Sequence, residues 1–385
     1  MLVRITIVNK RMFTFVGCMA NQIFKRYFPP ELLLRELDNY KFLKKEVLGY
    51  SVQSKPIYEI RMGQGKRKIM MWSQMHGNET TTTKALLDLF IWLNNIEQQP
   101  LLDTFSLYII PQLNPDGAAA YTRLNANLVD LNRDAIDLSQ PESKILRAAY
   151  ERIQPDYALN LHGQRTIYGA GNQGGPATLS FLAPAADPQR TITLARTKAM
   201  EAIAAIKKQL TSELPQGIGR YDDQFNPNCV GDAFTQLGTP TLLFEAGHFP
   251  GDYQREQVRS FVFKAYQALF RYLLEPSSQF STVSYFDIPE NTSNYVDLIV
   301  EDVALEAEGK LYQHQQVAIQ YAEVLVQGEV CFLPTFKAFS EKLPYKAHRY
   351  LNFNKDVFDG VLSFRQDQVI KNDRLNQLFS VKSRF

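Results

Sequence analysis

The apolar positions change their spacing repeatedly between about residue 30 and residue 275. Short alternating or continuous apolar runs predict strands, and segments with apolar residues three or four apart predict helices between them. In one such helix, Leu86, Leu89, Phe90 and Leu93 form a single stripe. The expected strands are 55–63, 68–75, 105–111, 157–161, 178–184 and 239–247, and the expected helices are 29–45, 79–95, 141–153, 187–210 and 252–275.

Strands that alternate with helices predict an α/β fold, with a mostly parallel mixed sheet flanked by helices on both faces. After Pro276 the pattern changes, because 277–295 is rich in Ser, Thr, Asn and Pro, as linkers are. Strand-like runs follow at 295–307, 316–326 and 329–334. We therefore expect an N-terminal extension over 1–27, a catalytic domain over 28–276 and a small β-rich accessory domain over 285–385.

Composition and charge narrow the class of protein. Hydrophobic residues make up 45% and charged residues 21%, as in ordinary globular proteins. The net charge of +2 gives no general attraction to nucleic acid, and no apolar stretch is long enough to predict a membrane span. Three cysteines cannot build a disulfide framework, which favours a reducing, cytoplasmic location.

The N-terminus leaves one alternative open. Lys10 and Arg11 precede a short apolar run that faintly resembles a signal or lipoprotein segment. The simpler interpretation is an upstream extension, with Met19 as the natural start.

Four polar clusters, HGNE, NPDG, NLHGQ and FEAG, each follow a predicted strand. In open α/β sheets, ligands bind beyond the carboxyl ends of the strands. The four clusters therefore predict one site at a shared sheet edge.

His76 and Glu79 form an HxxE pair whose three-residue step places both side chains on one side of a helical turn. With His162 they make the two-histidine, one-glutamate set of a catalytic zinc site, which leaves one position for water. The alternative is that His162 is a strand-end histidine bonded to backbone. The set predicts one zinc ion per chain.

Three further charged residues have two interpretations each. Arg123 and Arg133 could stabilise an oxyanion and bind a carboxylate, or form surface salt bridges. Glu245 ends an apolar run, where a buried carboxylate is either a general base or half of an ion pair.

In their order, SVQSKPIYEIRMG, HGNE, NPDG with Arg123, VDLNR, NLHG and FEAG resemble the zinc metallocarboxypeptidases, the carboxypeptidase A-like family. The resemblance covers about residues 48 to 250. It implies a mixed eight-stranded sheet and one zinc ion held by His76, Glu79 and His162.

The same resemblance implies the chemical roles. Glu245 corresponds to the general base, Arg123 to the residue that polarises the scissile carbonyl, and Tyr221 is the candidate for the tyrosine that caps the substrate. The loop 217–232 around Tyr221 departs from the family's pattern.

The resemblance also implies how substrate and metal are positioned. Asn132 and Arg133 correspond to the pair that holds the substrate's terminal carboxylate, and Asp130 to the carboxylate that orients the first histidine. VDLNR is followed by Asp134 where the pancreatic enzymes have asparagine, so side-chain preference is not defined.

The leading hypothesis is hydrolysis of a C-terminal amide bond in a peptide or small peptide-like substrate with a free carboxylate. The alternative is a zinc deacylase of N-acyl amino acids, similar to aspartoacylase and succinylglutamate desuccinylase, which share HGNE and DLNR and carry a C-terminal β domain. A third reading is a non-enzymatic metal- or carbohydrate-binding module. Because every motif lies before residue 250, we expect residues 285–385 to be separable from the metal site.

Overall fold

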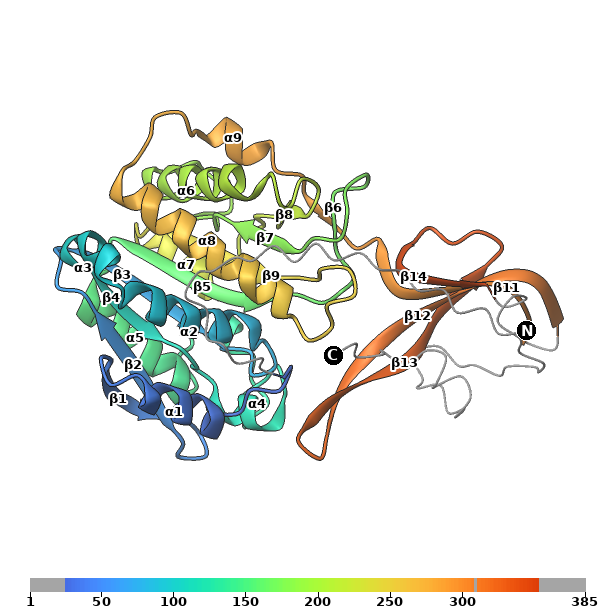
Figure 1. Ribbon diagram of the computed structural model, residues 1–385, viewed down its shortest axis with the longest axis horizontal. Helices are drawn as coiled ribbons and strands as arrows, with labels where there is room; N and C mark the ends of the chain where they lie inside the picture. The colour runs from blue at the N-terminus through green and yellow to red at the C-terminus, as the bar shows by residue number, and fades with distance from the viewer. Residues whose placement is uncertain (1–24, 308–309, 353–385) are drawn as a thin grey trace.

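The computed structural model describes residues 25–307 and 310–352. Its larger sheet has eight strands in the order β1-β2-β4-β3-β5-β9-β7-β8 (Figure 1). The four strands β4, β3, β5 and β9 run parallel, while β1, β2 and β7 pair antiparallel with their inner neighbours. The strands are β1 (Lys44–Tyr50), β2 (Pro56–Met62), β3 (Arg67–Ser73), β4 (Phe105–Ile110), β5 (Tyr157–Gly163), β7 (Leu179–Leu182), β8 (Ile218–Arg220) and β9 (Thr241–Ala246).

Helices cover both faces of this sheet, which confirms the predicted α/β class. In β3, Ile69 and Met71 pack into the core on one face, and Met70 and Trp72 pack into the core on the other. A strand buried on both faces has a continuous apolar sequence, as this one does. On the first face lie α1 (Pro30–Asn39), α2 (Thr81–Leu93), α6 (Leu194–Leu210) and α8 (Glu256–Leu274), and on the second lie α5 (Pro141–Ile153) and α7 (Val230–Gln236).

One buried and one partly buried ion pair tie α2 to α8. Lys84 Nζ lies 2.6 Å from Glu256 Oε1, and the guanidinium of Arg259 donates two hydrogen bonds of 2.7 Å to Asp88. Removing one partner of such a pair leaves an uncompensated buried charge, which costs about 3–5 kcal/mol. The pairs therefore hold α2, and the loop that leads into it, in one position against the sheet.

Two predicted helices have different bounds in the structure. The helix expected over 29–45 ends at Asn39, and β1 begins at Lys44. β1 is an edge strand whose first four residues are all exposed. Its sequence therefore lacks the alternation of apolar and polar residues that predicts a strand. The helix expected over 187–210 begins at Leu194, because the hydroxyl of Thr193 caps it by accepting from the backbone N–H of Arg196.

A second sheet of four strands lies beside the α/β layers (Figure 1). It consists of β11 (Tyr295–Ala307), β12 (Lys310–Val326), β13 (Glu329–Ser340) and β14 (Lys346–Asn352), in the order β13-β12-β11-β14. The first three were predicted from the sequence and the fourth was not. Outside both sheets lie β6 (Gly169–Ala170) and β10 (Asn291–Thr292), which pair with each other, α3 (Gln99–Thr104), α4 (Pro115–Ala120), α9 (Thr282–Phe286), η1 (Ile96–Gln98) and η2 (Leu131–Arg133).

The proposed domain bounds of 1–27, 28–276 and 285–385 stay predictions. Residues 1–24, with the alternative start at Met19, and residues 353–385 lie outside the described residues. Within the described chain, no helix combines the length and apolar character that crossing a membrane requires.

Two histidines meet where the four-stranded sheet contacts the α/β part. His248 follows β9 and His348 lies on β14, with ring centroids 4.2 Å apart. His348 Nε2 donates to the carbonyl of Thr166 at 2.7 Å, and Tyr295 stacks on its other side. Burial lowers the pKa of His248 well below its ordinary value and that of His348 to about 4. Both rings are therefore neutral at pH 7.

We predict that His348 makes the protein less stable in mild acid. An unfolded histidine has a pKa of about 6.5, so the unfolded chain binds a proton first as the pH falls from about 6.5 toward 4. The stabilising contribution is complete above pH 6.5 and is lost toward pH 4. His348→Gln keeps a donor for the Thr166 carbonyl but cannot titrate. Between pH 7 and 5, urea unfolding should show wild type losing about 1–2 kcal/mol more than the variant.

The comparison must be made between the two proteins, because Asp297 titrates in the same range. Burial raises the pKa of Asp297 to about 6, so its contribution to stability changes in the opposite direction as the pH falls. Equal pH dependence in wild type and His348→Gln would contradict the assignment to His348.

Candidate metal centre and cleft

The loop after β3 carries HGNE and is held by the NPDG segment. Gln74, with a φ of 47°, turns the chain after the strand and donates from Nε2 to the carbonyl of Gly77 at 2.8 Å. A Cβ on Gly77 would lie 1.9 Å from the carbonyl carbon of Gly117, so only glycine fits there. Asn114 accepts from Gly117 N–H and donates to the carbonyl of Met75. NPDG therefore positions the loop before α2.

The three predicted ligands lie together and are buried or nearly so. Their candidate ligand atoms all fall within 4.8 Å of one another. Glu79 Oε1 is 2.8 Å from His76 Nδ1, and Glu79 Oε2 is 2.9 Å from His162 Nδ1. The backbone N–H of Gly163 also donates to Glu79 Oε2. His76 comes from the loop after β3 and His162 from β5, which are neighbouring parallel strands.

The donor set fits a cation better than it fits hydrogen bonding alone. The two Nδ1 atoms of His76 and His162 face each other at 3.2 Å beside one carboxylate. Hydrogen bonds alone would require His76 to carry a proton on both nitrogens, and His162 Nε2 is buried without a partner among the described residues. Two imidazole nitrogens and one carboxylate are a known ligand set of catalytic zinc.

Asp130 orients His76. Its Oδ1 lies 2.9 Å from His76 Nε2 and also accepts from the backbone N–H of Asn132. Arg123 donates to Asp130 Oδ2 from Nε and Nη2, at 3.1 and 3.0 Å. Although burial opposes it, hydrogen bonding to His76 and the charge of Arg123 hold the pKa of Asp130 below its usual range. With Nε2 occupied, Nδ1 of His76 is left to face Glu79.

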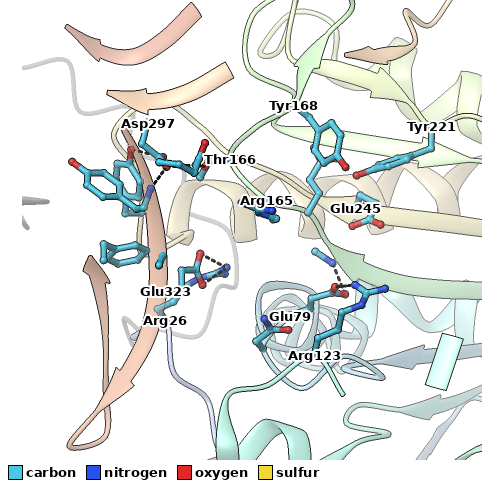
Figure 2. A pocket seen from close by; sticks show the side chains of 18 residues that line it. Arg26, Glu79, Arg123, Arg165, Thr166, Tyr168, Tyr221, Glu245, Asp297 and Glu323 are labelled. Atoms are coloured by element: carbon cyan, nitrogen blue, oxygen red, sulfur yellow. Dashed lines mark hydrogen bonds and ion pairs between the residues drawn. The ribbon is translucent and has the colours of Figure 1, made fainter. Parts of the chain in front are cut away.

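Glu245 and Tyr221 line the same cavity as Glu79 and Arg123 and lie across it from them (Figure 2). Glu245 on β9 is the register partner of His162 on β5. Its Oε2 is buried without a hydrogen-bond partner among the described residues, and burial together with the Glu79 carboxylate raises its pKa. The Tyr221 ring packs edge-on against Tyr168, with centroids 5.4 Å apart, and burial raises its pKa.

Asn132 and Arg133 lie next to this group but have other contacts. Asn132 is buried and its Oδ1 accepts from the backbone N–H of Val230 at 3.2 Å. The exposed Arg133 guanidinium donates to the Asn132 carbonyl and to Cys229 Sγ, at 2.8 and 3.0 Å. Neither residue lines the cavity that contains Glu79 and Glu245.

That cavity has a volume of about 410 Å³ and extends from Glu79, one of the three predicted metal ligands, to the four-stranded sheet (Figure 2). One end holds Glu79, Arg123 and Glu245. The far wall includes Asp297 of β11, Tyr321 and Glu323 of β12, Phe332 of β13, and Arg26 from the segment before α1.

No pattern in the sequence predicts this wall. Its residues belong to no motif, and only the fold brings them to the cleft. Arg165, which also lines the cavity, stands three residues after His162 in NLHGQR and could have been noticed there. That residues 285–385 are separable from the metal ligands stays a prediction, but the cleft itself depends on β11, β12 and β13.

Comparisons with known proteins point to one family. Residues 33–140 match the family described as zinc carboxypeptidase. A curated relative, carboxypeptidase SOL1 of Arabidopsis thaliana, is 32% identical over 137 residues, which are 30% of this chain and 28% of that protein. The match therefore spans little more than a quarter of the relative's length. The predicted resemblance to zinc metallocarboxypeptidases is confirmed.

Solved structures agree on the fold. Metallocarboxypeptidases from Burkholderia cenocepacia and Pseudomonas aeruginosa each align with a TM-score of 0.52, at 18% and 19% sequence identity. Each alignment covers 64% of this chain and 69% of the other. The second structure was solved in complex with (2-guanidinoethylmercapto)succinic acid.

We predict that the purified protein binds one zinc ion and that His162→Ala loses most of it. Removing one of three ligands leaves two, too few for a stable site of this kind. His314→Ala is the matched control, because that histidine side chain is 81% exposed and pairs with Asp302. Metal content after equilibrium dialysis is the measurement. Stoichiometric zinc in folded His162→Ala would show that the ligand assignment is wrong.

Proposed function

We propose that this protein is a zinc-dependent carboxypeptidase that hydrolyses the C-terminal amide bond of a peptide or peptide-like substrate. The main support is the grouping of His76, Glu79 and His162, with Glu79 sharing a cavity with Glu245, whose Oε2 has no hydrogen-bond partner among the described residues. When bound, zinc supplies a Lewis acid that polarises a carbonyl oxygen and lowers the pKa of nearby water. The chain's own residues supply the remaining chemistry.

Glu245 is the proposed general base. It accepts the proton of the attacking water through a carboxylate oxygen and passes it to the leaving amine. Its position on β9 beside His162 on β5 brings the carboxylate to the metal ligands without a flexible loop. A rigid strand pair holds the base in the geometry that proton transfer needs.

Arg123 is the proposed group that stabilises the oxyanion. Two of its nitrogens are held by Asp130, while Nη1 points toward Glu79 at 3.5 Å. The side chain is 46% exposed and lines the cavity. A guanidinium that is held by Asp130 and partly exposed to the cavity can donate to a developing negative charge with little rearrangement.

Asn132 and Arg133 are the proposed partners of the substrate's terminal carboxylate. Arg133 donates to a carbonyl and to a thiol sulfur, which is a weak acceptor, and forms no ion pair with any described residue. Its guanidinium is therefore open to a carboxylate, which binds in a bidentate manner. Asp130, two and three residues earlier, ties this pair to the metal centre.

The deacylase of N-acyl amino acids remains the second candidate, because one structural feature favours small substrates. The four-stranded sheet closes the cleft into a space of about 410 Å³, near the lower end of small-molecule pockets. A panel of blocked dipeptides and N-acyl amino acids distinguishes the two activities by their relative kcat/KM.

We predict that Glu245→Gln keeps the fold and the zinc but lowers kcat by at least about 10²–10⁴-fold. The amide preserves the shape of the side chain and removes its basicity. Glu151→Gln, at a side chain 61% exposed on α5, is the control and should match wild type. Steady-state rates and metal content, measured on the same preparations, test whether the variant keeps zinc while losing turnover. Wild-type turnover in Glu245→Gln would assign the proton transfer to another group.

We predict that Arg133→Ala lowers kcat/KM by about ten- to a few hundred-fold on a peptide with a free C-terminal carboxylate. A hydrogen bond to a charged group contributes about 1.5–3 kcal/mol, and about 1.4 kcal/mol corresponds to a factor of ten. The same peptide with an amidated C-terminus should be poor for wild type and little affected by the substitution.

The control for this comparison is Arg35→Ala, since Arg35 on α1 is 65% exposed and does not line the cavity. Equal wild-type rates on the acid and amide forms would rule out carboxypeptidase specificity.

A further inference from the structure

The charged groups of the cavity wall almost all have hydrogen-bond partners within the wall. Arg26 donates from Nη2 to both carboxylate oxygens of Glu323, at 3.2 Å each, and Tyr121 OH donates to the same carboxylate. Arg26 is nearly buried and Glu323 is 24% exposed, and the two opposite charges are paired with each other within the wall. Although burial opposes it, Arg26 holds the pKa of Glu323 below its usual range.

The Asp297 carboxylate likewise accepts several hydrogen bonds from within the protein. It accepts from Tyr253 OH at 2.9 Å, from the backbone N–H of Tyr321 at 2.7 Å, and from the Gln320 side chain. A carboxylate with three donors has little capacity left for a ligand. The charged side chains Glu323 and Asp297 in the wall formed by the four-stranded sheet are therefore held in place by hydrogen bonds within the protein.

Arg165 differs from these groups. Among residues 25–307 and 310–352 it forms no hydrogen bond or ion pair, and its side chain lines the cavity. Figure 2 shows it between the Glu245 end and the Arg26–Glu323 pair. Its neighbour Thr166 is held on both sides, because His348 donates to its carbonyl and Gln320 donates to its hydroxyl. The backbone that carries Arg165 is thus fixed.

The structure assigns Arg165 as the binding residue for a second negative charge on the substrate, carried by the residue on the acyl side of the scissile bond. This inference rests on the proposed function, because Arg133 then holds the terminal carboxylate outside the cavity. The cavity, which begins at Glu79 and Glu245 and ends at the four-stranded sheet, must receive the acyl side. An unpaired guanidinium within it favours a carboxylate or a similar anion.

The far wall also limits the length of that acyl portion. Tyr253, Tyr321 and Phe332 contact one another edge-on, with ring centroids 5.3–6.5 Å apart, and line the far wall of the cleft. Moving the rings of a packed aromatic cluster to admit a ligand would cost packing energy. The preferred substrate is therefore a short peptide-like molecule with two negative charges, one on each side of the bond that is cut.

The test uses two peptides that differ by one charge, N-acetyl-Glu-Xaa and N-acetyl-Gln-Xaa, where Xaa is the residue that the wild type cleaves best in a library. Wild type should prefer the Glu peptide by at least about 10-fold in kcat/KM, which corresponds to about 1.4 kcal/mol. Arg165→Gln should bring the ratio near one mainly by lowering kcat/KM on the Glu peptide. Arg165→Lys should retain part of the preference, and added salt should reduce it in wild type.

Arg35→Gln serves as the control and should leave the ratio unchanged. Cleavage of either peptide by wild type supports the proposed function whatever the ratio. A ratio near one in wild type, or one that Arg165→Gln does not change, overturns the assignment of Arg165 alone. Absence of cleavage on every peptide counts against the proposed function instead.

A binding measurement tests the role of Arg165 independently of the proposed catalytic function. In the Glu245→Gln protein loaded with zinc, calorimetry should show tighter binding of the Glu peptide than of the Gln peptide, and Arg165→Gln in that background should abolish the difference. Extending the acyl side by four residues should lower kcat/KM at least about 10-fold. Equal rates on long and short peptides would overturn the length limit.

Discussion

The structure depends on concentrating two histidines and two carboxylates in a space sheltered from water. Glu79, His76, His162 and Glu245 cannot share such a space at low cost unless a cation balances them. The parallel strands β3, β5 and β9 bring their carboxyl ends to one sheet edge and deliver these groups there. The ion pairs between α2 and α8 hold the N-terminal end of α2, next to Glu79, against that edge.

The part of the site that the sequence could predict is the part that lies directly after strands. HGNE, NLHG and FEAG each follow a run of buried apolar residues, so their meeting follows from the topology of a parallel sheet. NPDG was predicted to belong to the same site, but in the structure it supports the loop that carries His76. Asn114 and Gly117 shape the loop that carries His76, and that role depends on a close backbone approach that no spacing reveals.

The cleft wall could not be predicted, because it depends on how two sheets meet. Arg26, Asp297 and Glu323 are separated by up to 297 residues in the chain and converge only when β11 and β12 pack beside the strand ends. β1 and β14 were missed for a related reason, since edge strands with mixed polarity lack a periodic signal. Long-range packing, rather than local pattern, therefore sets the size and charge of the cavity, and the surroundings of Arg165 depend on that packing.

We infer that one zinc ion lies among His76, Glu79 and His162. The most direct measurement is a crystal structure of the zinc-loaded protein with diffraction data collected on both sides of the zinc absorption edge. We predict a single anomalous peak in contact with Nδ1 of both histidines and with the Glu79 carboxylate, facing the cavity that Glu245 lines. A peak at other residues, or none in protein shown to contain zinc in solution, would contradict the account.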